Sequence, residues 1–293
     1  MIPEDILLEI FDFYRLDAME PRGGLWKWHR LAHVCQKWRH VISMSPCRLD
    51  LRILCQYGTP IEYFLDFWPT LPLIVHFDAS RQSSNHMPRN IMLTLRHPNR
   101  LREIDLRVPS SMTGPIVEMV PKPCSSLESI RIVVKDATGP SIPVLDEFLG
   151  GSAPHLREIK LDGISLPFPE IRRVLSSTNF NLVQLHLSKI PHAVYFSPDD
   201  LVTALSTLAR LRRLTVGFHS PASSPPPSMT GRPRQRTTTL PSLRFLHFHG
   251  TTEYLEEFVA QIHSPALHDI TIHFFNQIFF DTPQVGKFIS HSN

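Results

Sequence analysis

A pattern of the form Leu-x-x-φ-x-φ, in which φ is an aliphatic residue or Phe, recurs seven times along the chain. The two φ positions lie two residues apart, the spacing that places side chains on one face of a β-strand. Successive first leucines lie 24 to 32 residues apart. Self-similarity at this interval predicts a stack of repeated units. The copies are Leu101-Ile104-Leu106, Leu127-Ile130-Ile132, Leu156-Ile159-Leu161, Leu182-Leu185-Leu187, Leu211-Leu214-Val216, Leu243-Leu246-Phe248 and Leu267-Ile270-Ile272.

Helix signals fall between the repeated segments. Ser197 followed by Pro198 is typical of a helix start, and the apolar residues within 168–175 and 255–262 follow helical spacing. One strand plus one helix cannot bury its apolar faces alone, so neighbouring units must stack. The pattern resembles leucine-rich repeats, whose period is about 20–29 residues. We therefore expect an α/β fold, a leucine-rich-repeat-like solenoid with a parallel concave sheet and helices outside.

The first fifty residues lack this repeat and predict three short helices. Pro3 suits a first helical turn, where its missing N–H costs nothing, and two acidic residues after it complement the positive end of a helix. The apolar residues from Ile6 to Tyr14 follow a 3.6-residue period. Further helices are expected over residues 25–34 and 36–42, ending before Ser45 and Pro46.

The segments IPEDILLEIF (residues 2–11) and VCQKW (residues 34–38) resemble the F-box, with Ile2 where Leu is usual and a longer connection at 15–24. The resemblance implies an F-box helical domain over residues 1–50, followed by the solenoid over 51–293. It also implies that the helices dock onto the Skp-type linker protein of a cullin-RING ubiquitin ligase. The positions expected to face the linker or its supporting core are Pro3, Ile6, Leu7, Ile10, Phe11, Leu31, Val34, Cys35 and Trp38.

The residues between the φ positions should point onto the concave wall of the sheet. Toward the C-terminal repeats this wall becomes richer in His and aromatic residues, which favours binding of a protein target. An ordinary solvated strand face would show the same alternation, so both interpretations stay open. The positions predicted to bind the target are Arg131, Lys160, His186, Arg213, Phe245, His247 and Asp269.

Together these features predict a substrate-recognition adaptor of an SCF-type ubiquitin ligase. The alternative is a ligase-independent leucine-rich-repeat scaffold whose N-terminal helices only cap the repeats. A nucleic-acid-binding solenoid would need a basic stripe on the concave wall, and acids such as Glu103, Asp105 and Glu158 interrupt it. The 30 basic residues include only seven Lys and therefore 23 Arg, which favours an acidic partner unless these are simply solvated surface arginines.

Residues 219–239 are rich in Pro, Ser, Thr and Arg and nearly devoid of apolar residues. We expect a disordered insertion between two repeats. It is either a tolerated surface loop or a regulatory segment that carries phosphorylation sites, a polyproline helix or a small basic localisation patch.

Catalytic chemistry is not indicated. His29 and His33 have the spacing of a helical zinc pair, but Arg30 stands where a zinc protease has its Glu. Cys35 is expected in an apolar helix, where its thiol would be inert. We therefore expect no enzyme activity, metal or cofactor. Four cysteines without a CxxC pair suggest the cytosol or nucleus, and no apolar run reaches the ~20 residues of a membrane span.

Overall fold

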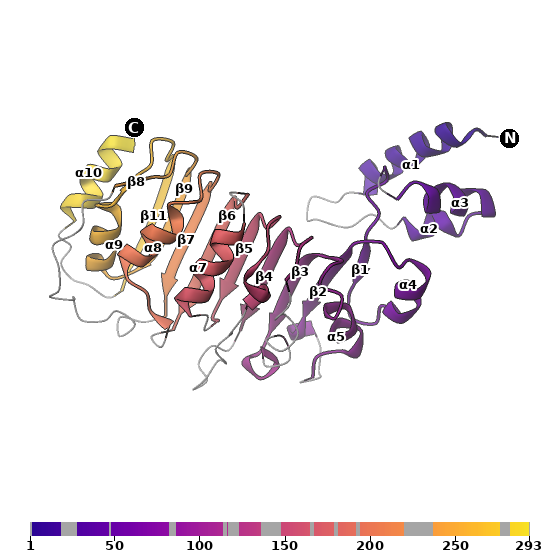
Figure 1. Ribbon diagram of the computed structural model, residues 1–293, viewed down its shortest axis with the longest axis horizontal. Helices are drawn as coiled ribbons and strands as arrows, with labels where there is room; N and C mark the ends of the chain where they lie inside the picture. Colours follow the sequence, from indigo (N-terminus) through magenta and orange to yellow (C-terminus); the bar gives the residue numbers. More distant parts are fainter. Residues whose placement is uncertain are drawn as a thin grey trace.

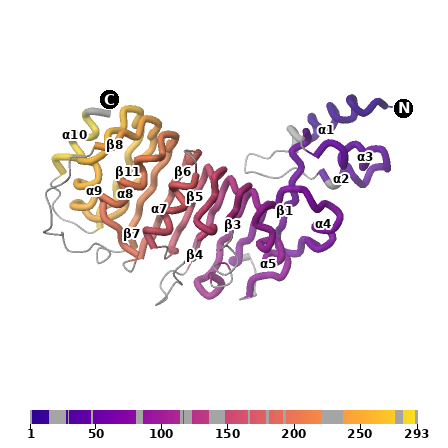
Figure 2. The backbone as a smooth tube through the Cα atoms, viewed as in Figure 1, coloured from indigo at the N-terminus to yellow at the C-terminus, as the bar shows by residue number. Residues whose placement is uncertain are grey.

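The computed structural model describes residues 2–18, 28–46, 48–81, 86–113, 116, 123–135, 148–164, 167–178, 181–191, 194–219, 237–275 and 282–292. The chain passes from three N-terminal helices along a single row of strands to a helix at the C-terminal end (Figure 1). The trace advances one unit at a time without returning to an earlier unit (Figure 2).

Nine strands form one parallel sheet in sequence order, β1-β2-β3-β4-β5-β6-β7-β9-β11. The predicted α/β class with a parallel sheet is thereby confirmed. The strands are β1 (Ile53–Cys55), β2 (Leu73–Asp78), β3 (Leu101–Val108), β4 (Ser129–Val134), β5 (Glu158–Asp162), β6 (Gln184–Ile190), β7 (Arg213–Phe218), β9 (Phe245–Gly250) and β11 (Asp269–Phe274).

The repeated apolar positions account for the register of this sheet. The first φ residues pair with one another across successive strands, as in Ile104 with Ile130 and Ile130 with Ile159. Each of the seven repeat leucines is at most 7% exposed. The predicted buried seam is confirmed for the repeats up to β9, whereas Ile270 and Ile272 of the edge strand β11 are half-buried. This register is strongly specified, because a slip by one residue would turn every φ side chain to the opposite face.

Helices connect most of the strands, and α7, α8 and α9 lie on one face of the sheet (Figure 1). Helix α8 begins with a capping box, in which Ser197 Oγ accepts the Asp200 N–H at 3.1 Å and the Asp200 carboxylate accepts the Ser197 N–H at 3.3 Å. The α-helices of this part are α4 (Ile61–Phe67), α5 (Arg89–Leu95), α7 (Phe168–Ser177), α8 (Pro198–Leu205), α9 (Thr252–Val259) and α10 (Pro283–Ser292).

The expectation of one α-helix per unit is too simple. The described part of the connection from β4 to β5 contains a 3-10 turn, η3 (Phe148–Gly151), where Leu149 and Gly150 both have positive φ. Two further 3-10 turns follow strands, η1 (Ala79–Arg81) after β2 and η2 (Ser110–Met112) after β3.

The two ends of the predicted insertion at 219–239 are hydrogen-bonded to the rest of the fold. Thr238–Thr239 form strand β8, which pairs in parallel with β10 (Ile262–His263). At the other end, the His219 N–H donates to the Ile190 carbonyl at 3.0 Å. The prediction of disorder is therefore wrong for Thr238 and Thr239, while residues 220–236 lie outside the described residues.

The described part of the first 44 residues contains the helices α1 (Glu4–Ala18), α2 (His29–Ala32) and α3 (Gln36–Met44). Phe11 of α1 meets Trp38 of α3 edge to face, with ring centroids 5.0 Å apart. Trp28 joins this part to the sheet, because its indole N–H donates to the Arg52 carbonyl at 2.8 Å. The second helix is shorter than the predicted 25–34, and residues 19–27 lie outside the described residues. No helix in the described part of the chain combines the length and apolarity needed to span a bilayer.

Candidate functional site

The polar positions of the strands form rows across the sheet face that is turned away from α7, α8 and α9. We call this surface the open face. Parallel pairing aligns its side chains because partners in register point the same way. The C-terminal rows are Glu158-Gln184-Arg213-Phe245-Asp269 and Lys160-His186-Thr215-His247-Thr271. The register between β6 and β7 shifts after Leu187, so the next row, Gly217-His249-His273, spans only β7, β9 and β11.

The N-terminal half of the open face is a network of ion pairs. Arg131 bridges two strands, since its guanidinium lies 3.1 Å from the Glu158 carboxylate and 3.7 Å from that of Asp105. Lys135 pairs in the same way with Asp78 at 2.8 Å. Partly exposed pairs of this kind each contribute little stability. Their consequence here is that the charges of Arg131, Lys135 and their partners are balanced by neighbours on the sheet.

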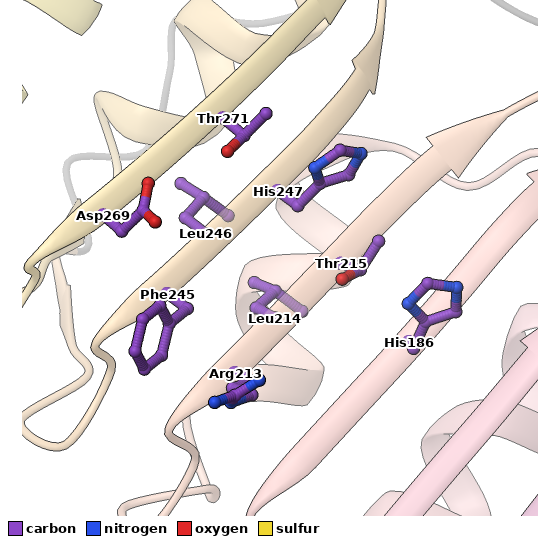
Figure 3. Close-up of a pocket in the computed structure, with 9 residues that line it drawn as sticks. All are labelled: His186, Arg213, Leu214, Thr215, Phe245, Leu246, His247, Asp269 and Thr271. Carbon is purple, nitrogen blue, oxygen red and sulfur yellow. The ribbon is translucent and has the colours of Figure 1, made fainter.

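The C-terminal half instead contains an open hollow with a volume of about 310 Å³ (Figure 3). The ring of Phe245, 37% exposed, stands in its first row between Arg213 on β7 and Asp269 on β11. Neither Arg213 nor Asp269 forms an ion pair within the described residues. The hollow is lined by His186, Arg213, Leu214, Thr215, Phe245, Leu246, His247, Asp269 and Thr271.

Histidines continue from the hollow toward the strand ends. The ring of His273 lies 5.2 Å from that of His247 and 6.3 Å from that of His249. Burial lowers the pKa values of His247 and His249, and the neighbouring His273 lowers them further. Burial, assisted by Lys160, lowers the pKa of His186 to about 4. These three imidazoles are therefore mostly neutral at pH 7, and the hollow offers uncharged rings.

The structure brings together five of the seven residues predicted to bind the target. His186, Arg213, Phe245, His247 and Asp269 all line the hollow. Arg131 and Lys160 lie on the same face but outside the hollow, on β4 and β5. The guanidinium of Arg131 is already paired with the carboxylates of Asp105 and Glu158. Sequence reasoning missed the contribution of Leu214 and Leu246 to the lining. They are buried φ positions, and alternation alone assigns them to the opposite side.

The nine positions predicted to face the linker divide into two groups. Leu7, Phe11 and Leu31 are buried in the protein's own core, and Trp38 is half-buried against Phe11. The exposed group is Pro3, Ile6, Ile10, Val34 and Cys35. Further exposed apolar side chains of α1 and α3 were not predicted, namely Phe13 and Met44.

The predicted surroundings of Cys35 are wrong. Cys35 is exposed and lies at the N-cap of α3, not inside a helix. Its backbone is extended there, with φ −161° and ψ 171°. The side chain of His29 lies outside the described residues, so the predicted absence of a zinc pair is untested. Among the side chains that are described, no three His, Cys, Asp or Glu gather so that they could hold a metal ion.

Two surfaces thus stand out, the exposed apolar residues of the N-terminal helices and the hollow of the open face. They lie near opposite ends of the row of strands (Figure 1). Neither a search against protein-family models nor a search of curated proteins finds a match to this chain.

Proposed function

We propose that this protein is a non-enzymatic substrate-recognition adaptor of an SCF-type cullin-RING ubiquitin ligase. Its N-terminal helices act as an F-box and dock onto the Skp-type linker. Its leucine-rich-repeat-like sheet binds a protein target on the open face. The work of the adaptor is then to hold the target near the ubiquitin donor, which raises their effective concentration without cofactor chemistry. The reaction would take place in the cytosol or nucleus.

One observation carries the proposal: helix α1 is apolar on two sides. Leu7 and Phe11 are buried in the core, while Ile6 and Ile10, one helical turn apart, remain 42% and 41% exposed. A helix that packs on one surface only needs a single apolar stripe. Ile2, Phe13, Val34 and Met44 are also exposed on this part of the chain. An exposed apolar stripe along a helix, such as that of Ile6 and Ile10, is typical of a protein interface.

The experiment is co-purification of the full chain with a Skp-type linker. The double substitution Ile6→Asp and Ile10→Asp should abolish linker binding, because two carboxylates would have to be desolvated in the interface. Ile289→Asp on α10 is the matched control, since Ile289 is 39% exposed. It should leave linker binding intact. Undiminished binding by the double variant would refute docking through α1.

A ligase-independent scaffold is the second candidate, and the contacts of Trp28 favour it. Besides its hydrogen bond to Arg52, the Trp28 ring meets Trp68 edge to face at 5.1 Å. Helix α2 therefore packs against the first unit of the sheet as a cap would. Failure of the unmodified chain to bind any Skp-type linker, with capture of a target retained, would select this candidate.

A further inference from the structure

A column of residues immediately precedes the strands of the C-terminal half. Its members are joined through the backbone: the carbonyl of Arg212 accepts the N–H of Arg244 at 2.9 Å, and the carbonyl of Arg244 accepts that of His268 at 2.9 Å. Adjacent members are therefore one strand spacing apart, about 4.8 Å. We call this set the entry column, and it consists of Arg157, Val183, Arg212, Arg244 and His268.

The arginines of the entry column lack the counter-charges found earlier in the same ladder. Arg102, the second residue of β3, occupies the equivalent position of this hydrogen-bond ladder, and its guanidinium lies 2.8 Å from the carboxylate of Glu128, the next member. Arg157, Arg212 and Arg244 are exposed and form no ion pair with any described residue. Like charges on neighbouring strands are destabilising. Arg212 and Arg244 thus keep a repulsion that an anionic partner would relieve.

The backbone of the entry column adjoins the hollow. Arg213 and Phe245 follow Arg212 and Arg244 directly in the chain, and both line the hollow. A ligand on this part of the open face would meet cations along one edge and an exposed aromatic ring beside them. His186 and His247 add little charge at pH 7, so the positive charge around the hollow comes from the arginines of the entry column, from Arg213 and from Lys160, the register partner of His186.

We infer that this surface binds an extended acidic peptide segment. The segment places carboxylate or phosphate groups against Arg212, Arg213 and Arg244, and an apolar side chain against Phe245. Arginine pairs well with either anion because its planar fork donates two hydrogen bonds at once. The inference rests on the proposed function, since it names the class of target that the adaptor recognises.

A peptide fits this surface better than a nucleic acid. Asp269 and Glu158 lie in the first row of the open face, beside Phe245 and Gln184. A nucleic acid carries a charge on every nucleotide and would bring some of its phosphates against these carboxylates. A peptide can place its anions singly, opposite the arginines.

The test is selection of random dodecapeptides displayed on phage against the full chain, which can be carried out whether or not the chain binds a linker. Selected sequences should be enriched in Asp and Glu and contain an apolar or aromatic residue. A synthetic selected peptide should bind at least roughly tenfold more weakly to the variant R212E/R244E. Arg172→Glu is the control, because Arg172 is an exposed arginine on α7. It should leave peptide binding unchanged, and the thermal unfolding of both variants verifies that they fold.

Selected sequences that are neutral or basic, or that bind R212E/R244E as well as the unmodified chain, would overturn the inference. Replacing one Glu of the selected peptide by phosphoserine separates the two anions: tighter binding assigns the site to phosphate and weaker binding to carboxylate. The inference would also be overturned, in favour of nucleic acid, if single-stranded RNA bound the chain more tightly than the peptide and if R212E/R244E lost that RNA binding. Linker binding by R212E/R244E is measured in parallel, so that loss of ligase docking is not mistaken for loss of the peptide site.

Discussion

The guanidinium of Arg213 lies over the ring of Phe245, with 4.5 Å between Cζ and the ring centroid. The two residues are register partners on β7 and β9, so the sheet itself brings them together. An exposed cation–π contact contributes about 0.5–1 kcal/mol. The contact holds the aromatic ring upright beside the hollow, where it can meet a ligand without first being ordered.

Replacing Phe245 and His247 together with Ala should weaken target capture and leave linker binding intact. Both side chains line the hollow and are partly exposed, so their removal should cost less than ~1 kcal/mol of unfolding free energy. Mass spectrometry of co-purifying proteins, with and without proteasome inhibition, measures the effect. Phe67→Ala on α4 removes an exposed aromatic ring elsewhere and is the control. Equal capture by the double variant and the control would refute the assignment of the hollow.

Tyr254→Phe should stabilise the protein by about 1 kcal/mol. The Tyr254 side chain is buried against Phe218 and Phe248, and its hydroxyl has no hydrogen-bond partner among the residues that the structure describes. Burying an unpaired hydroxyl costs roughly 1–3 kcal/mol, and the substitution removes that cost without changing the ring. Urea unfolding at pH 7 measures the difference. A marked loss of stability would show that the hydroxyl has a partner after all.

Acid should destabilise the protein through His186. Its pKa is about 4 in the folded state, chiefly because of burial, against an ordinary value of 6.5. As the pH falls below 6.5 the unfolded chain gains a proton that the folded chain does not, so stability is lost until the pH reaches about 4. His186→Gln should flatten this part of the profile, measured by urea unfolding between these two pH values. Parallel profiles for the two proteins would argue against His186 as the source.

Ser197→Ala should destabilise α8 by about 1 kcal/mol, because it removes the hydroxyl that accepts the Asp200 N–H. Ser206→Ala, at the C-cap of the same helix, tests whether the effect is specific to the start of the helix. Amide hydrogen exchange of α8 reports the local change. If both substitutions have equal effects, the capping box is not the cause.

The strands could be predicted because each strand packs against equivalent strands in the units on either side, which require the same apolar positions. Ile130 and Ile159 meet equivalent residues in adjacent units, so a local pattern carries long-range information. The helix at Ser197 was predictable for a different reason, since its cap is made by residues three apart. Strand β8 was not, because Thr238 acquires its partner from Ile262, across the whole of α9. The 3-10 turn at Leu149 depends on a positive φ that no local signal announces.

The rows of the open face follow from alternation, and so five lining residues of the hollow could be named in advance. The hollow itself could not be predicted, because its shape depends on how the side chains of four strands fill the space between them. The arginines of the entry column are visible in the printed sequence, where Arg follows the first Leu of a repeat at positions 157, 212 and 244. Their lack of counter-ions becomes apparent only when neighbouring strands are compared.

The unbroken order of the strands makes the sheet a spacer of fixed pitch. From β1, beside the N-terminal helices, to β9, which carries Phe245, there are seven steps of about 4.8 Å, or roughly 34 Å along the sheet. Deleting or inserting one whole unit between them would change this separation by a single step and leave both surfaces as they are. The number of repeats is therefore itself a geometric parameter, one that can vary independently of what either end recognises.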